Sequence, residues 1–269
     1  MCLNSMNKKE PVGVYIHVPF CDGKCPYCDF YSLYGNDKLI DEYTQTVSKV
    51  MAKSSEKWNR TADTLYFGGG TPNLLGQERL SFLIKTAKEK FGLENAEITV
   101  EVNPAEDLSG FLEEIKKAGA NRLSIGLQSA NEDELKLLGR RHTVKQAEKA
   151  VKDAQNAGSK NISLDLMLAI QKQTKESLLR SINFCAYLLK IEPKTLYYRK
   201  RDKLDVPNDD EAAELYLTAC EELEKRGFMQ YEISNFAKPG FESRHNLKYW
   251  DCKEYIGIGP AAHSFMDGK

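Results

Sequence analysis

The chain has 269 residues, of which 41% are hydrophobic, so it is long enough to bury the core of one large domain. Its 38 basic residues balance its 39 acidic ones, which gives no electrostatic reason to expect a nucleic-acid partner. No apolar run approaches the ~20 residues of a transmembrane helix, and the polar N-terminus lacks the apolar core of a signal peptide. We therefore expect a cytoplasmic protein.

The first 227 residues alternate short apolar runs with helical patterns. We expect β-strands at residues 13–18, 64–67, 97–102, 122–127 and 161–168, and the run at 195–198 is compatible with a sixth. The spacing of apolar residues predicts helices at about 39–51, 77–90, 108–118, 175–189 and 210–226, with two more on either side of Gly139. Asn131 and Glu134 predict a capping box at the start of the first of these two.

This alternation predicts an α/β fold with a parallel sheet, either open or curled into a barrel. In such barrels the functional residues gather at the carboxyl ends of the strands. The distinctive residues of this chain lie at those ends. A cysteine loop follows the first strand and a glycine run at 68–70 the second, while Glu101, Gln128 and Asp165 lie at or near the ends of the next three. We therefore expect a single functional rim.

After Gly227 the pattern changes. Residues 228–236 are strand-like, 238–240 form a turn, 245–250 are rich in aromatic residues and 257–260 are rich in glycine. We interpret residues 11–227 as one barrel domain and residues 228–269 as the start of a C-terminal accessory module, which the chain cuts short.

Three of the seven cysteines, Cys21, Cys25 and Cys28, lie within eight residues. In a reducing compartment such clustering indicates a metal or redox site, and soft thiolates favour zinc or an iron–sulfur cluster. A structural zinc site needs four ligands, often as two separated pairs, and the sequence offers no second pair. Three cysteines on a [4Fe–4S] cluster leave one iron open for a substrate, which is the reading we favour over zinc. The four scattered cysteines are assigned no function.

This cysteine loop after a first strand, in a repeated strand–helix chain, resembles the radical S-adenosylmethionine (SAM) enzymes. The resemblance implies a partial (β/α)6, TIM-like barrel in which the open iron chelates SAM and an electron cleaves it to a 5′-deoxyadenosyl radical. A closer resemblance is to the group of oxygen-independent coproporphyrinogen III oxidases and HemW-type haem chaperones. It is carried by residues 15–21, 25–30, 67–72, 101–104, 121–129, 138–140, 231–237, 245–250 and 257–260.

The resemblance also implies roles for individual residues. Tyr15 and Tyr27 would flank the cofactor near the cluster. Gly69 and Gly70 would let the backbone approach the methionine amino group, and Thr71 would add a hydroxyl. Polar groups of the cofactor would contact Glu101, Gln128 and Asp165, and Arg140 would pair with the methionine carboxylate. In the tail, His245 would be a haem ligand, with Tyr249 and Trp250 packing on the porphyrin.

Two functions fit this group. One is a haem chaperone that binds haem and delivers it to acceptor proteins, with peripheral membrane association through those acceptors. The alternative is an oxidase that decarboxylates coproporphyrinogen III. Three features favour the chaperone: Phe30 stands where the oxidases have a fourth cysteine, only about ten residues precede Pro11, and 245–250 match the haem-associated motif.

The chain departs from the group's pattern after Asp165. The group usually has Gly-Leu-Pro-Gly-Gln-Thr where this chain has residues 169–174, so that Ala169 and Lys172 replace glycines. We expect an altered loop beside the cofactor.

Overall fold

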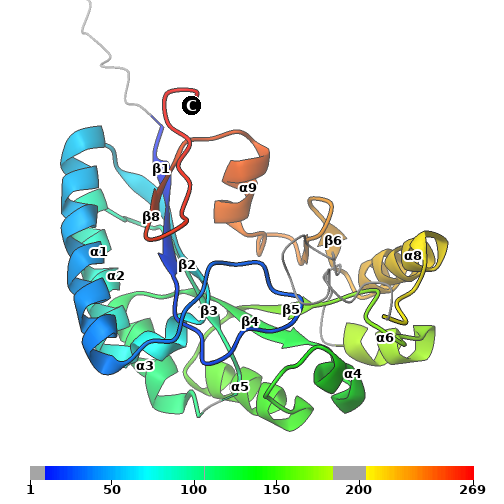
Figure 1. Cartoon of the computed structure of the whole chain (residues 1–269). Coiled ribbons are helices and arrows are strands. Elements are labelled where there is room, and N and C mark those ends of the chain that lie inside the picture. The colour runs from blue at the N-terminus through cyan, green and yellow to red at the C-terminus, as the bar shows by residue number, and fades with distance from the viewer. Residues whose placement is uncertain (1–9, 106, 184–203) are drawn as a thin grey trace, which may run out of the picture.

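The computed structural model describes residues 10–105, 107–183 and 204–269. Its centre is a six-stranded sheet in the order β5-β4-β3-β2-β1-β8, in which all neighbouring strands run parallel (Figure 1). The strands are β1 (Val12–Val18), β2 (Ala62–Gly69), β3 (Glu97–Val102), β4 (Arg122–Gln128), β5 (Asn161–Leu166) and β8 (Tyr255–Ile258). The predicted α/β fold is confirmed, and the first five strands lie where the sequence predicts them.

Helices follow the strands and cover the outer face of the sheet (Figure 1). The predicted positions are confirmed for those that the structure describes. A helix was also expected to run to residue 189 and a strand to lie at 195–198, but residues 184–203 lie outside the described ranges. The helices are α1 (Asp37–Trp58), η1 (Pro72–Leu75), α2 (Gln77–Phe91), α3 (Ser109–Ala118), α4 (Glu132–Leu137), α5 (Val144–Asn156), α6 (Lys175–Ile182), α8 (Asp209–Lys225) and α9 (Arg244–Trp250).

The outward-facing side chains of the strands are apolar, except for Asp63 near the start of β2. Successive residues of a strand point to opposite faces, so every second residue belongs to one face. Most of the outward-facing set is buried against the helices, and much of it belongs to the main hydrophobic core. This set comprises Val12, Val14, Ile16, Val18, Leu65, Phe67, Ile98, Val100, Val102, Leu123, Ile125, Leu127, Ile162, Leu164 and Leu166.

The inward-facing residues are mostly polar. Because the strands are parallel, the registers set these residues side by side in rows across the sheet: Gly68, Glu101 and Ser124 follow one another, with Ser163 next in the row. One step nearer the strand starts lie Tyr66, Thr99 and Arg122. A polar interior enclosed by an apolar outer layer is suited to holding a ligand.

The C-terminal tail closes the end of the barrel at which the strands start. The expected strand at 228–236 is instead two short antiparallel strands, β6 (Met229–Gln230) and β7 (Phe236–Ala237). The glycine-rich segment forms β8, which extends the main sheet beside β1. This pairing was not predicted. It joins residues 255–258 directly to the barrel sheet.

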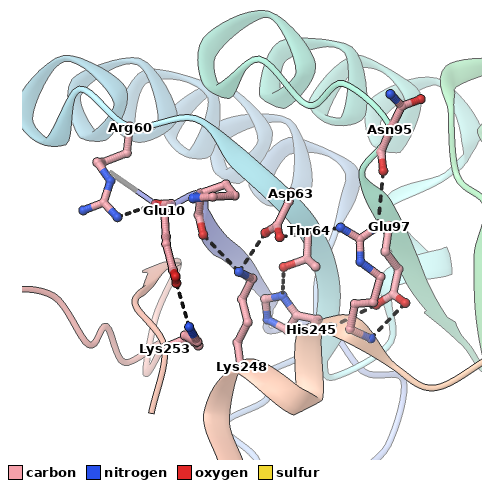
Figure 2. Close-up of polar contacts among 11 residues, drawn as sticks. Glu10, Arg60, Asp63, Thr64, Asn95, Glu97, His245, Lys248 and Lys253 are labelled. Carbon is pink, nitrogen blue, oxygen red and sulfur yellow. Dashed lines mark hydrogen bonds and ion pairs between the residues drawn. The ribbon is translucent and has the colours of Figure 1, made fainter. Parts of the chain in front are cut away.

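Helix α9 is fixed against the starts of β1, β2 and β3 (Figure 2). The backbone N–H groups of Arg244 and His245 donate to the buried Glu97 carboxylate, at 3.0 and 3.1 Å. A hydrogen bond of 2.8 Å joins Thr64 Oγ1 to Nδ1 of His245. Gly13 leaves the space that this packing needs, because a Cβ there would lie 3.0 Å from Lys248 and 3.1 Å from His245. Residues far apart in the sequence thus close one end of the barrel.

The predicted capping box at Asn131 is wrong. The Asn131 side chain makes no cap to α4, and its Nδ2 donates instead to the carbonyl of Ser177 on α6, at 2.9 Å. Glu134 is buried and accepts from the hydroxyls of Ser129 and Ser177. Tertiary contacts to α6 therefore replace the local bonds that the spacing suggested.

The loop after β5 holds two residues in a backbone conformation that favours glycine. Ala169 and Lys172 have φ angles of 57° and 61°, in the left-handed region. This conformation costs a residue with a Cβ about 1–2 kcal/mol.

No helix in the described ranges is long and apolar enough to cross a bilayer.

We predict that Lys172→Gly stabilises the protein. Lys172 is exposed, so the substitution removes backbone strain without losing packing. The free energy of unfolding should rise by about 0.5–1 kcal/mol, after allowance for the greater freedom of glycine in the unfolded chain. Denaturant unfolding measures this. As a control, Ala213→Gly at an exposed position of α8 should lower it by about 1 kcal/mol; a loss of stability in Lys172→Gly would refute the strain.

Candidate functional site

The cysteine loop lies at the carboxyl end of β1, on the rim where the other strands also end. Cys21, Cys25 and Cys28 are half-buried free thiols that line one cavity of about 760 Å³. The Thr71 hydroxyl lies 3.6 Å from Sγ of Cys21, and Nη1 of Arg140 lies 3.9 Å from Sγ of Cys25. Residues from the second and fourth strand–helix units therefore border the thiols, as the rim hypothesis requires.

The cavity extends from this rim into the barrel. Its walls are the inward-facing side chains of β2 to β5, together with loop residues and two asparagines of the tail. Most of the residues expected at the cofactor line it, namely Tyr27, Gly69, Gly70, Thr71, Glu101, Gln128, Arg140 and Asp165. The sequence thus identified much of the cavity wall near the carboxyl ends of the strands.

Two carboxyl groups, those of Glu101 and Asp165, lie close enough inside the cavity for their charges to interact. Glu101 accepts hydrogen bonds from the Tyr66 hydroxyl at 2.9 Å and from the backbone N–H of Gly69 at 3.2 Å. Asp165 accepts from the Ser124 hydroxyl at 3.0 Å. Burial and, secondly, the charge of Asp165 raise the pKa of Glu101 to about 7, and burial also raises the pKa of Asp165. Glu101 therefore titrates near neutral pH and can accept bonds from ligand hydroxyl or ammonium groups when ionised.

Arg140 joins the cysteine loop to β4. Its Nη2 donates to the carbonyl of Gly126 at 2.9 Å, and its Nη1 lies 3.5 Å from the Tyr27 hydroxyl. Its buried Nε has no hydrogen-bond partner. A guanidinium held in this way presents a charged donor beside the thiols, which suits a ligand carboxylate.

The remaining rim residues are held by tight backbone packing. The N–H of Gly70 donates to the carbonyl of Val18, and a Cβ on Gly70 would lie 2.5 Å from the carbonyl oxygen of Phe20. Glycine is therefore required here by the approach of two loops. Gln128 has a φ of 68°, and the β4–β5 register shifts at the same place. Such strain in a residue with a long side chain often marks a ligand site.

Two expected cofactor residues do not line the cavity. Tyr15 lies on β1 with its hydroxyl 3.1 Å from Nδ1 of His17, and its ring packs near those of Tyr66 and His245. His245 is 1% exposed, and both its ring nitrogens have partners, Thr64 and Tyr249. Both residues belong to an aromatic cluster with Tyr66, and His245 lies at the strand starts, the end of the barrel away from the cysteines.

The sequence analysis did not identify the part of the cavity wall that lies nearer the strand starts. It is formed by Tyr66, Arg122, Ser124 and Ser163. Three of them are in the same alternation as recognised inward residues, since Arg122 and Ser124 precede Gln128 by even numbers of positions and Ser163 precedes Asp165 by two. This alternation along the strands was the signal in the sequence that could have identified these residues as inward-facing.

The donor set fits an iron–sulfur cluster. Three thiols line one end of a single cavity, and thiolates are the ligands such clusters use. Within the described ranges, no three His, Cys, Asp or Glu side chains are drawn together closely enough to hold a metal ion as they stand.

Comparison with known proteins identifies the family. The family model of the radical SAM superfamily matches residues 15–185, more than half of the chain. The chain belongs to the radical SAM superfamily. Within that superfamily it belongs to the HemW group: it is 37% identical to the heme chaperone HemW of Bacillus subtilis, over 95% of this chain and 71% of that protein. For the heme chaperone HemW of Escherichia coli the identity is 36%, over 98% of this chain and 73% of that protein.

A solved structure shows the same fold. Coproporphyrinogen III oxidase (HemN) from Escherichia coli, a radical SAM enzyme, superimposes with a TM-score of 0.81 at 22% identity. The match covers 96% of this chain and 65% of that one, so the chain spans about two thirds of its length. This confirms the TIM-like radical SAM barrel. Membership of the superfamily implies a [4Fe–4S] cluster and SAM.

We predict that Cys25→Ala loses the cluster. After anaerobic reconstitution the wild type should hold about four iron atoms and four sulfides per chain, and the variant should hold little of either. Iron and sulfide analysis and the visible absorption spectrum measure this. Cys252→Ala, which removes an exposed cysteine, is the matched control and should retain the cluster. Tightly bound zinc without sulfide in the wild type would contradict the assignment.

We predict a pH-dependent gain of stability in Glu101→Gln. The folded pKa of about 7 lies above the ordinary value of 4.5, so the wild type loses stability as the pH rises from 4.5 through 7. Water in the cavity screens part of this effect, and we expect the variant to be more stable by about 2 kcal/mol at pH 8 and by much less at pH 5. Denaturant unfolding at both pH values measures the difference. Equal differences at both would show that Glu101 is ionised throughout.

Proposed function

We propose that this radical SAM protein is a haem chaperone that takes up haem in the cytoplasm and passes it to acceptor proteins. The carrying observation is the similarity to heme chaperones named HemW, at 35–37% identity over nearly the whole chain. The likeness to the oxidase is 22% identical and supports the fold alone. Phe30, which stands where the oxidases have a further cysteine, is 62% exposed on the cysteine loop. The chaperone is therefore the better-supported function.

The barrel rim would hold the cluster and SAM. Cys21, Cys25 and Cys28 would bind the cluster, and when bound it would supply an open iron site and an electron for SAM. The protein's own residues would position SAM. The charged fork of Arg140 would pair with a carboxylate, and Glu101, when ionised, would accept hydrogen bonds from hydroxyl or ammonium groups. The enclosing walls would limit the access of water.

Haem would bind at the other end, through His245. The bond between Nδ1 of His245 and Thr64 is the kind of contact that orients a metal-binding imidazole and leaves Nε2 as the ligand atom. Nε2 is 2.9 Å from the Tyr249 hydroxyl. Tyr249 and Trp250 are 36% and 59% exposed on the same helix, so they are accessible to a porphyrin face. Haem iron would bind to Nε2 of His245 in place of the hydrogen bond to the Tyr249 hydroxyl.

Burial makes His245 suitable as a neutral ligand. Loss of hydration, and then the charges of Lys248 and Arg122, lower the pKa of His245 to about 3. The imidazole is therefore neutral throughout the physiological range, and a neutral imidazole is the form that binds iron.

We predict opposite effects of two substitutions on haem affinity. His245→Ala should weaken haem binding at least tenfold by removing the ligand, whereas Tyr249→Phe should strengthen it about fivefold by removing a competing hydrogen bond. Absorption titrations with haem measure both. His263→Ala, at an exposed histidine, should leave the affinity unchanged. Coproporphyrinogen turnover is assayed in parallel, and robust decarboxylation without haem uptake would contradict the chaperone proposal.

A further inference from the structure

A buried arginine in the barrel interior has no role in the cofactor site described above. Arg122 is the first residue of β4 and is 4% exposed. It is paired with Thr99, one inward row nearer the strand starts than Glu101 and Ser124, and it lines the large cavity. It therefore lies on the side of the cavity away from the cysteine rim.

The guanidinium of Arg122 is incompletely bonded. Its Nε and Nη1 atoms are buried and have no hydrogen-bond partner. Among the described residues, no carboxylate forms an ion pair with it within 4.0 Å. A buried charge without a partner costs several kcal/mol, so such groups are rarely kept unless a ligand completes them.

The nearby carboxyl groups are already bonded elsewhere. Glu101 accepts from Tyr66 and Gly69, and Asp165 accepts from Ser124. Both lower the net positive charge of the cavity without bonding directly to Arg122. Their presence disfavours a doubly charged phosphate and favours a singly charged, planar anion, which a guanidinium binds through two parallel hydrogen bonds.

Arg122 also lines a second cavity, of about 490 Å³. The two cavities share Arg122, Ser163 and Asn235. The second contains the aromatic rings of Phe228, Tyr231, Phe236 and Phe241 and the cations Lys160 and Lys238. Aromatic rings beside cations suit a ligand with an apolar body and acidic substituents.

We propose that Arg122 binds a carboxylate of a ligand that enters the barrel. The methionine carboxylate of SAM is assigned to the cysteine rim beside Arg140, so it is not the group that Arg122 would meet. The position of Arg122 between an aromatic cavity and the polar one suits the propionate of a tetrapyrrole, and this ligand rests on the proposed function.

The test compares each ligand with a form that lacks the free carboxylate. Haem and haem dimethyl ester, and SAM and decarboxylated SAM, are titrated into wild type, Arg122→Gln and Arg122→Lys. If Arg122 binds a propionate, Arg122→Gln should lose at least tenfold in affinity for haem and keep its affinity for the ester. Arg122→Gln should leave the ratio of the affinities for SAM and decarboxylated SAM unchanged, because Arg140 serves the methionine carboxylate; a selective loss for SAM would overturn the assignment to a propionate. Arg122→Lys should lose less, because it keeps the charge without the planar fork.

Comparing the affinities of each variant for the two ligands of a pair distinguishes a misfolded variant from a lost carboxylate contact. Unchanged affinity for the ester or for decarboxylated SAM shows that the variant retains its cavity. Arg226→Gln, at a surface arginine that pairs with Glu222 and lines neither cavity, is the matched control and should change neither ratio. A wild type that binds neither haem nor its ester would refute the chaperone. A wild type that binds both, with an Arg122→Gln variant that keeps the full preference for haem over its ester, would refute only the role of Arg122. Equal losses, or no loss, for both members of both pairs would overturn the carboxylate site.

Discussion

The structure depends on one constraint, the alternation of side chains along parallel strands. Apart from Asp63 and Gly69 in β2, every second residue of β1 to β5 is apolar and packs beneath the helices, and the residues between them are mostly polar and face inward. Burial of the apolar set stabilises the barrel at roughly 25 cal/mol per Å² of apolar surface. That outer layer allows the interior to be polar. The interior carries Glu101, Asp165, Arg122 and Arg140, and these charges would be unfavourable in a barrel packed only for stability.

The two ends of this interior have different chemistry. At the carboxyl ends of the strands, three thiols and Arg140 surround a cavity mouth, which suits a cluster and a zwitterionic cofactor. At the strand starts, α9 is held by Glu97 and Thr64 and brings His245 into an aromatic cluster. Radical chemistry and haem would thus be handled at separate ends of one barrel. Arg122, between them, is placed to contact a ligand that reaches from either side.

Much of this arrangement could be predicted from the sequence. The strands and the rim followed from periodicity, and the cysteine spacing led to the family. What could not be predicted was long-range. Asn131 and Glu134 have the spacing of a capping box but bond to α6, and nothing local indicates that residues 255–258 pair with β1. Arg122 was missed although its parity with Gln128 was visible, because an arginine at a strand start is usually solvated. The substitutions at Ala169 and Lys172 were recognised, but only the structure shows that both positions are left-handed.

The central claim is that SAM binds in the barrel cavity directly on a cluster held by Cys21, Cys25 and Cys28. The most direct measurement is electron–nuclear double resonance on the reduced, reconstituted protein with SAM labelled with ¹⁵N at the methionine amino group. We predict a resolved hyperfine coupling between the label and the cluster, which disappears when unlabelled SAM replaces it. A reduced [4Fe–4S] cluster whose spectrum is the same with and without saturating SAM, and which shows no coupling to the label, would contradict the account.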